Sequence, residues 1–297
     1  MSDVLNATAG ESFGSRLSST FATLGHLCVG IDPHPFLLAE WSLSDDAASL
    51  REFGLRVVDA VAGTAGMIKP QVAFFERHGS AGYAALEAVF AAARDAGILV
   101  IADAKRGDIG TTVEAYGQSW LTPGSPLEAD AMTISAFQGV GSITAPHELA
   151  LATGKGLFVL AATSNPESID SQQAVIGGGE HSGRTVAGSI VGSVHQWNSD
   201  EATNNGSVRL GSTGVVLGAT LTLADYGIDL AELAATPILA PGFGSQGAKL
   251  EQLGELYGAA SGNVIVSASR SILSAGPGSV ASAVAQQVAE VAEAFSS

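Results

Sequence analysis

The sequence predicts an α/β fold in which a single (β/α)8 barrel follows an extra N-terminal helix. Eight short apolar segments alternate with segments of helical period along the 297 residues. Because the apolar segments lack the polar alternation of half-exposed strands, they indicate strands buried on both faces of a parallel sheet. Open doubly wound sheets usually contain about five or six strands, so eight strand–helix units favour the closed TIM barrel.

The predicted elements run through the chain without a linker or a change of composition, so residues 1–297 are expected to form one domain. The predicted strands are short, mostly apolar runs and cover residues 27–32, 66–71, 98–103, 131–136, 157–163, 214–220, 237–242 and 263–269. The predicted helices are amphipathic and cover residues 46–63, 80–96, 112–120, 142–153, 183–199, 222–234, 246–259 and 278–295. The extra helix, residues 11–24, precedes the first strand.

The longest irregular segment is residues 164–183, directly after the fifth predicted strand. It contains a glycine triplet, residues 177–179, which regular secondary structure accommodates poorly. Two interpretations remain open for it, a mobile lid over the mouth of the barrel and a passive surface insertion.

Composition excludes several classes of function. The net charge is −16 with 13 basic residues and no basic run, which argues against binding nucleic acid or an anionic membrane. The single cysteine, Cys28, lies in an apolar strand and is expected to be a buried thiol. The histidines lack zinc-site spacing, so no metal is expected. Neither a signal peptide nor an apolar run of membrane-spanning length is visible, which favours a cytoplasmic protein.

Polar residues gather at the predicted strand ends, where a (β/α)8 barrel carries its active site. They are Asp32, Lys69, Asp103, Lys105, Asp108, Ser164, Ser269 and Arg270. Lys69 and Lys105 are two of only four lysines in the chain. Charges at the exit of an apolar strand are costly unless they are paired and hydrogen-bonded. The cluster around Asp103 is therefore either a catalytic array or a structural network of ion pairs.

The segment PGFGSQG, residues 241–247, follows the seventh predicted strand and opens a predicted helix. Its glycines match the spacing G-x-G-x-x-G: Gly242, Gly244 and Gly247. A dinucleotide fold would place an acidic residue about 20 positions later, but this chain reaches Arg270 without one, so NAD or NADP is not expected. Gln246, the Ser269 amide and Arg270 could instead hold a phosphate. The alternative is a tight turn beside a surface arginine.

The segment IADAKRGDIGTT, residues 101–112, resembles the D-x-K-x-x-D signature of the orotidine 5′-phosphate decarboxylase family. Five more segments resemble the longer, bacterial form (type 2) of that enzyme, in the same order along the chain. They are VGIDPHP (29–35), IKPQVAFFERHG (68–79), ATSNP (162–166), APGFGSQG (240–247) and SASRSIL (267–273). The resemblance spans about residues 25–275. Inside the D-x-K-x-x-D motif, Arg106 and Gly107 differ from many members, but they occupy positions where the signature specifies no residue.

The resemblance implies decarboxylation of orotidine 5′-phosphate to uridine 5′-phosphate in pyrimidine biosynthesis, without metal or cofactor. Lys69, Asp103, Lys105 and Asp108 would form the family's charged array. Lys105 would stabilise the C6 carbanion electrostatically and then protonate it. The resemblance also implies a homodimer, because Asp108 and Thr112 would reach into the neighbouring subunit's site.

The same resemblance implies how the nucleotide would be bound. Asp32 and Lys69 would bind the ribose hydroxyls, with Asp108 on the 2′-hydroxyl, and Ser164 would bind the pyrimidine edge. The 5′-phosphate would lie in the glycine-rich turn with its other ligands: Gly244, Gln246, Ser269 and Arg270. The nearest alternative is a Mg²⁺-dependent sugar-phosphate decarboxylase or aldolase with the same barrel, but such enzymes carry a carboxylate where this chain has Lys69. A non-catalytic phosphoribosyl-binding protein is a further alternative.

Overall fold

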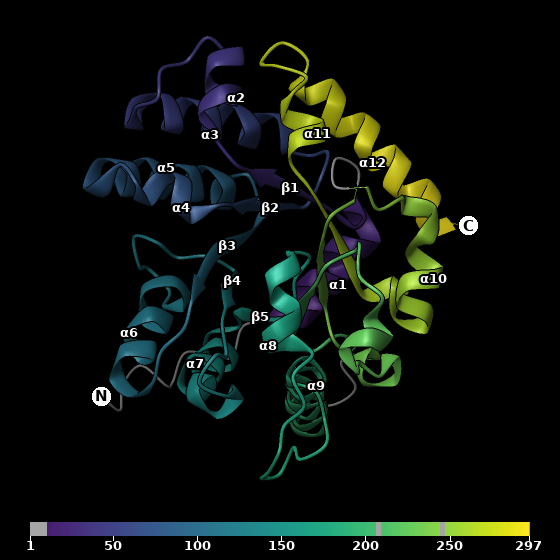
Figure 1. Cartoon of the computed structure of the whole chain (residues 1–297). Helices are drawn as coiled ribbons and strands as arrows, with labels where there is room; N and C mark the ends of the chain where they lie inside the picture. Colours follow the sequence, from purple (N-terminus) through teal and green to yellow (C-terminus); the bar gives the residue numbers. More distant parts are fainter. Residues whose placement is uncertain (1–10, 206–208, 244–246, 297) are drawn as a thin grey trace.

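The computed structural model describes residues 11–205, 209–243 and 247–296 (Figure 1). Eight parallel strands form a closed barrel in sequence order, and pairing between β1 and β8 completes the ring. The strands are β1 (Leu27–Ile31), β2 (Met67–Pro70), β3 (Leu99–Arg106), β4 (Ala131–Ile134), β5 (Gly156–Ala162), β6 (Thr213–Leu217), β7 (Ile238–Pro241) and β8 (Val264–Ala268). The predicted (β/α)8 barrel is thus confirmed.

Helices surround the barrel on the outside (Figure 1). The α-helices are α1 (Phe13–Leu24), α2 (Pro35–Glu40), α3 (Ala47–Val61), α4 (Val72–Glu76), α5 (Gly79–Asp95), α6 (Gly110–Leu121), α7 (Thr144–Thr153), α8 (Ile169–Gln172), α9 (Val186–Asn205), α10 (Leu253–Tyr257), α11 (Arg270–Leu273) and α12 (Val280–Ser296). The predicted N-terminal helix is confirmed as α1. The short helices α2, α4, α8 and α11 were not predicted, because each is too short to show a helical period.

Two predicted helices are wrong as continuous elements. Residues 222–234 form two 3₁₀ turns, η4 (Leu223–Tyr226) and η5 (Leu230–Leu233), separated by Gly227 with φ 62°. The described part of 246–259 contains a 3₁₀ turn, η6 (Leu250–Gln252), and α10, which ends at Gly258 with φ 52°. A residue in the left-handed region ends a helix, and glycine enters that region without steric cost.

Helix α1 closes the N-terminal end of the barrel. Phe13 and Leu17 are fully buried against side chains that point into the barrel from several strands. A Cβ on Gly14 would lie 2.0 Å from the Leu210 carbonyl oxygen, so glycine permits this close approach. Arg16 ties the helix down through Asp130 at 2.5 Å and the Gly154 carbonyl at 2.8 Å. The opposite, C-terminal end of the barrel therefore carries the opening to the interior.

The core has two layers, one inside the barrel and a larger one between the strands and the outer helices. Cys28 belongs to the inner layer as a fully buried free thiol, and burial raises its pKa to about 12. This agrees with the structural role expected for it. No helix among the described residues combines the length and apolarity needed to cross a bilayer.

Candidate active site

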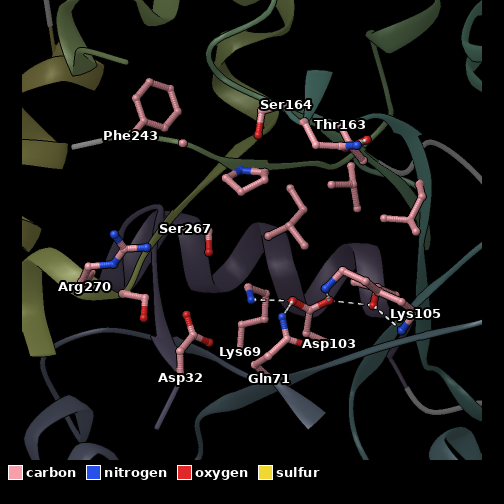
Figure 2. Close-up of a pocket in the computed structure, with 18 of the residues that line it drawn as sticks. Asp32, Lys69, Gln71, Asp103, Lys105, Thr163, Ser164, Phe243, Ser267 and Arg270 are labelled. Carbon is pink, nitrogen blue, oxygen red and sulfur yellow. Dashed lines mark hydrogen bonds and ion pairs between the residues drawn. The ribbon is translucent and has the colours of Figure 1, made fainter. Parts of the chain in front are cut away.

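A cavity of about 290 Å³ opens at the C-terminal ends of the strands. Seven of the predicted site residues line it: Asp32, Lys69, Asp103, Lys105, Ser164, Ser269 and Arg270. They come from β1, β2, β3, β5 and β8 or from the residues that directly follow these strands. In Figure 2 the labelled side chains run from Arg270 on one side, past Asp32 and Lys69, to Asp103 and Lys105 on the other.

Asp103 is the centre of the charged array. Its Oδ2 accepts hydrogen bonds from Lys69 Nζ at 2.7 Å and Gln71 Nε2 at 3.1 Å. Its Oδ1 accepts from Lys105 Nζ at 2.5 Å and Thr133 Oγ1 at 2.9 Å. The carboxylate is only 6% exposed, so four donors replace the water that it loses on burial.

These contacts fix the charge states of the buried pair. Burial alone would lower the pKa of the Lys69 ammonium, but Asp103 and then Asp32 outweigh burial and raise that pKa above its ordinary value. Burial likewise favours the neutral form of Asp103, yet Lys69 and Lys105 hold its pKa well below the usual range. At neutral pH the site therefore contains a buried carboxylate between two ammonium groups.

Asp32 lies beside this array at the end of β1. Its Oδ1 is buried and has no hydrogen-bond partner among the described residues. Such an atom is costly to bury unless a ligand or water completes its hydrogen bonding. A Cβ on Gly30 would lie 2.7 Å from Ser269 Cβ, so glycine in β1 lets the end of β8 pack close to Asp32. The carboxylate is thus available to a hydroxyl donor in the cavity.

Arg270 begins α11 directly after β8, and its side chain lies across the cavity from Lys105 (Figure 2). The predicted phosphate turn approaches the same region, since Gly242 and Phe243 line the cavity. Two predicted phosphate ligands, Gly244 and Gln246, lie outside the described residues.

Asp108 and Thr112 are not among the residues that line this cavity. Asp108 Oδ1 accepts a hydrogen bond from the Ile109 amide at 2.9 Å. Thr112 is exposed in the first turn of α6, and the Ile109 side chain between them is 60% exposed. A single chain therefore does not bring these two residues together with the rest of the predicted site.

Sequence reasoning missed Gln71 and Thr133, which both contact the Asp103 carboxylate. A signal for each was available in the strand alternation. Gln71 follows Lys69 by two positions, and residues two apart in extended backbone share a face. Thr133 is one of two polar residues in the predicted strand 131–136, the other being Ser135, and it lies inside the strand and not at its end, where the site was expected.

The comparisons with known proteins identify one family that this chain resembles. The model of the orotidine 5′-phosphate decarboxylase / HUMPS family matches residues 25–285. An orotidine 5′-phosphate decarboxylase of Salinispora arenicola is 47% identical over 267 residues, covering 90% of this chain and 91% of the relative. The enzyme of the same name from Streptomyces coelicolor is 47% identical over 268 residues, with 90% and 91% covered.

Solved structures give the same result. A crystal structure from Streptomyces avermitilis, of a protein assigned as an orotidine 5′-phosphate decarboxylase, has a TM-score of 0.89 and 44% identity over 98% of both chains. The Leishmania donovani OMP decarboxylase has a TM-score of 0.72 and 30% identity, covering 96% of this chain and 99% of that one.

Proposed function

The chain belongs to the orotidine 5′-phosphate decarboxylase / HUMPS family, and we propose that it converts orotidine 5′-phosphate to uridine 5′-phosphate and CO2 in pyrimidine biosynthesis. The observation that carries this proposal is the buried array in which each oxygen of Asp103 meets one ammonium, from Lys69 and Lys105. It lies in a cavity at the strand ends, where barrel enzymes perform their chemistry.

The order of side chains across the cavity matches the order of groups in the nucleotide. Arg270 and the Ser269 amide would hold the 5′-phosphate, and a guanidinium can bind it with two parallel hydrogen bonds. Asp32, with its unpaired Oδ1, and Lys69 would hold the ribose hydroxyls. Ser164 would bind the pyrimidine edge. The sequence-based expectation adds Gly244 and Gln246 to the phosphate site.

The pyrimidine ring would then lie with C6 beside Lys105. The C6–carboxylate bond breaks, its electron pair stays on C6, and CO2 leaves. The ammonium of Lys105 stabilises the resulting carbanion and then gives its proton to C6, after which solvent reprotonates the amine. A unit charge about 4 Å away contributes roughly 4 kcal/mol at an effective dielectric near 20, several times its value in water.

Asp103 would both orient Lys105 and face the substrate carboxylate. Because its pKa is held low by the two lysines, it stays ionised and would repel that carboxylate in the bound substrate. Loss of CO2 relieves this repulsion, and the developing carbanion then interacts with Lys105. Binding energy from the remote phosphate holds the ring in this arrangement.

We propose that the reaction needs no metal. The described residues contain no group of three or more His, Cys, Asp or Glu side chains arranged to hold one. In addition, the Lys69 ammonium would repel a divalent cation at the position where the Mg²⁺-dependent relatives need a carboxylate. The cation that this site requires is supplied by its lysines.

The direct experiment monitors purified protein by ultraviolet absorbance with orotidine 5′-phosphate, with and without EDTA. Turnover that EDTA leaves unchanged is expected. No turnover would refute the proposed function, and abolition by EDTA would favour the metal-dependent alternative. Lys105→Ala should fold normally and lose turnover, and substantial remaining activity would exclude Lys105 as the proton donor.

We further propose a homodimer with shared sites. Asp108 and Thr112 do not line their own cavity, and two apolar residues of this region, Ile109 and Phe137, are 60% and 89% exposed. The segments of Ile109 and Phe137 are neighbours, because the Ser135 amide donates to the Arg106 carbonyl at 2.7 Å. A second copy packed here would bury these two apolar side chains, and the resemblance to the family implies that Asp108 would then reach the other subunit's 2′-hydroxyl.

Mixing two inactive variants tests the shared site. Lys105→Ala and Asp108→Ala chains should regain part of the activity when they exchange subunits, since one of the two sites in the heterodimer is then intact. Absence of recovery despite confirmed exchange would count against the partner-supplied aspartate.

Residues 164–183 are proposed to act as a lid. The segment begins at the cavity with Ser164 and contains α8. Its second half is a small hairpin, in which Ile176 N donates to Arg184 O and Gly183 N to Ile176 O, both at 2.9 Å, so it is more regular than the sequence suggests. Limited proteolysis should cut it more slowly when a nucleotide inhibitor is bound. Equal cleavage would indicate a passive loop.

A further inference from the structure

The distinctive backbone feature of the site is a bulge in β3 opposite Thr133. Ala102 pairs with Met132 and Arg106 pairs with Ile134, so residues 103–105 of β3 lie opposite Thr133 alone. A regular ladder would advance both strands equally, and the additional residues in β3 disrupt the ladder locally. The bulge contains Asp103 and Lys105, the two groups closest to the proposed chemistry.

Lys105 has a backbone conformation that a lysine rarely adopts, with φ 48°. Left-handed backbone carries a steric cost for residues with a Cβ, so it persists only where the surroundings hold it. Hydrogen bonds hold the residues on either side of Lys105. Arg106 Nη1 donates to the Ala104 carbonyl at 2.9 Å, and the Arg106 carbonyl accepts from the Ser135 amide at 2.7 Å.

The Thr133 hydroxyl joins the two functional groups within the bulge. Its Oγ1 accepts a hydrogen bond from the Lys105 amide at 3.0 Å and donates one to Asp103 Oδ1 at 2.9 Å. That same oxygen of Asp103 receives Lys105 Nζ at 2.5 Å. One hydroxyl therefore fixes the backbone of the lysine and also the carboxylate that orients its ammonium, and Thr133 itself is only 1% exposed.

We infer that Thr133 is a positioning residue for the decarboxylation, because its hydroxyl holds the β3 bulge in the one conformation that presents the Lys105 ammonium and the Asp103 carboxylate together. This inference rests on the proposed function for its kinetic consequence. Thr133 lines the cavity, but its side-chain hydrogen bonds go to Lys105 and Asp103 and not to Arg270, Ser269 or Asp32. We therefore expect its contribution to fall on the chemical step more than on substrate binding.

The test compares Thr133→Val, which keeps the shape and removes the hydroxyl, with Thr133→Ser, which keeps the hydroxyl. A misplacement near 1 Å can cost about 100-fold, so Thr133→Val should lose kcat on the order of 100-fold with KM nearly unchanged. Thr133→Ser should recover most of kcat. A native kcat in Thr133→Val, or equal losses in both variants, would overturn the inference.

Thr213→Val is the matched control. Thr213 is also a fully buried strand threonine with a hydroxyl partner, His147 Nδ1 at 3.0 Å, but its partner lies outside the proposed site. Its kcat should equal that of the native protein. If Thr133→Val does not fold, Thr133→Ala takes its place, since it also removes the hydroxyl.

A second readout does not depend on turnover. The chain has four lysines, so nitrogen NMR of labelled side-chain amines gives four candidate signals, and Lys105→Ala assigns one of them. Thr133→Val should shift the Lys105 signal, while the Lys155 and Lys249 signals stay unchanged. An unshifted Lys105 signal would overturn the positioning role. If the native protein does not decarboxylate the nucleotide, the proposed function fails while this measurement still decides the role of Thr133.

Discussion

Replacing Asp103 with asparagine leaves the buried Lys69 ammonium without the carboxylate that lies 2.7 Å from it. Lys69 is 7% exposed, and breaking a buried ion pair by removing one partner typically costs about 3–5 kcal/mol. Lys105 adds little to this cost, because its side chain is 45% exposed and water can solvate its ammonium. We therefore expect Asp103→Asn to lower the free energy of unfolding by about 3–5 kcal/mol at pH 7.

Urea unfolding of the native protein and the variant across pH measures this loss. The pKa of Asp103 is lowered in the folded state, so its contribution is present above the ordinary value of 3.8 and is lost as pH falls through the folded value. The pKa of Lys69 is raised, so its contribution is present below 10.5 and is lost as pH rises through the folded value. The difference between the two proteins should thus be largest at neutral pH.

A surface pair provides the control. Asp45 forms an ion pair with Arg77, and both side chains are more than a third exposed. Asp45→Asn should cost at most about 1 kcal/mol. Two results would refute the argument that Asp103 stabilises the buried Lys69 ammonium. One is a loss of under about 1 kcal/mol in Asp103→Asn as well, and the other is an absence of coupling between Asp103→Asn and Lys69→Met in a double-mutant cycle.

Three further predictions follow from other parts of the molecule. Phe13→Ala should lower the free energy of unfolding by about 3–5 kcal/mol, because the ring is fully buried and packs edge-on against Phe158, and a loss near zero in denaturant titration would contradict its role in closing the barrel. Burial lowers the pKa of His147 from 6.5 to about 4. Its contribution to the free energy of unfolding is therefore complete above pH 6.5 and should fall by on the order of 2 kcal/mol by pH 5. Urea unfolding at pH 6.5 and pH 5 should show a smaller fall for His147→Asn. Arg270→Ala should reduce kcat/KM for the nucleotide at least about tenfold, and steady-state kinetics with orotidine, which lacks the phosphate, should show no such loss.

The sequence was sufficient to predict the barrel and most of the site because both depend on local patterns. Apolar runs of strand length identify β1 to β8, and polar residues directly after them identify Asp32 and Arg270. The sequence places Asp103 and Lys105 together at the end of β3, although it does not reveal the left-handed backbone at Lys105. Lys69 then lies next to these two residues because β2 and β3 are neighbouring parallel strands.

The bulge in β3 could not be predicted, because it depends on tertiary pairing. The β3 bulge is a property of the register between β3 and β4, and no pattern within residues 99–106 indicates that Thr133 alone faces residues 103–105. The wrong helix over 222–234 has a local origin. Its apolar residues fit a helical period, but Gly227, with φ 62°, divides the segment into two 3₁₀ turns.

The pairing of β1 with β8 has a consequence for how the chain is made. The His26 ring lies between Phe21 and Phe295, and its Nδ1 contacts the Val264 carbonyl, 238 residues further along the chain. During synthesis from the N-terminus, α1 and β1 therefore emerge long before the strand and helix that complete their packing. Contacts of such long sequence separation slow folding, so the apolar face of α1 must remain without its final partners until translation is nearly finished.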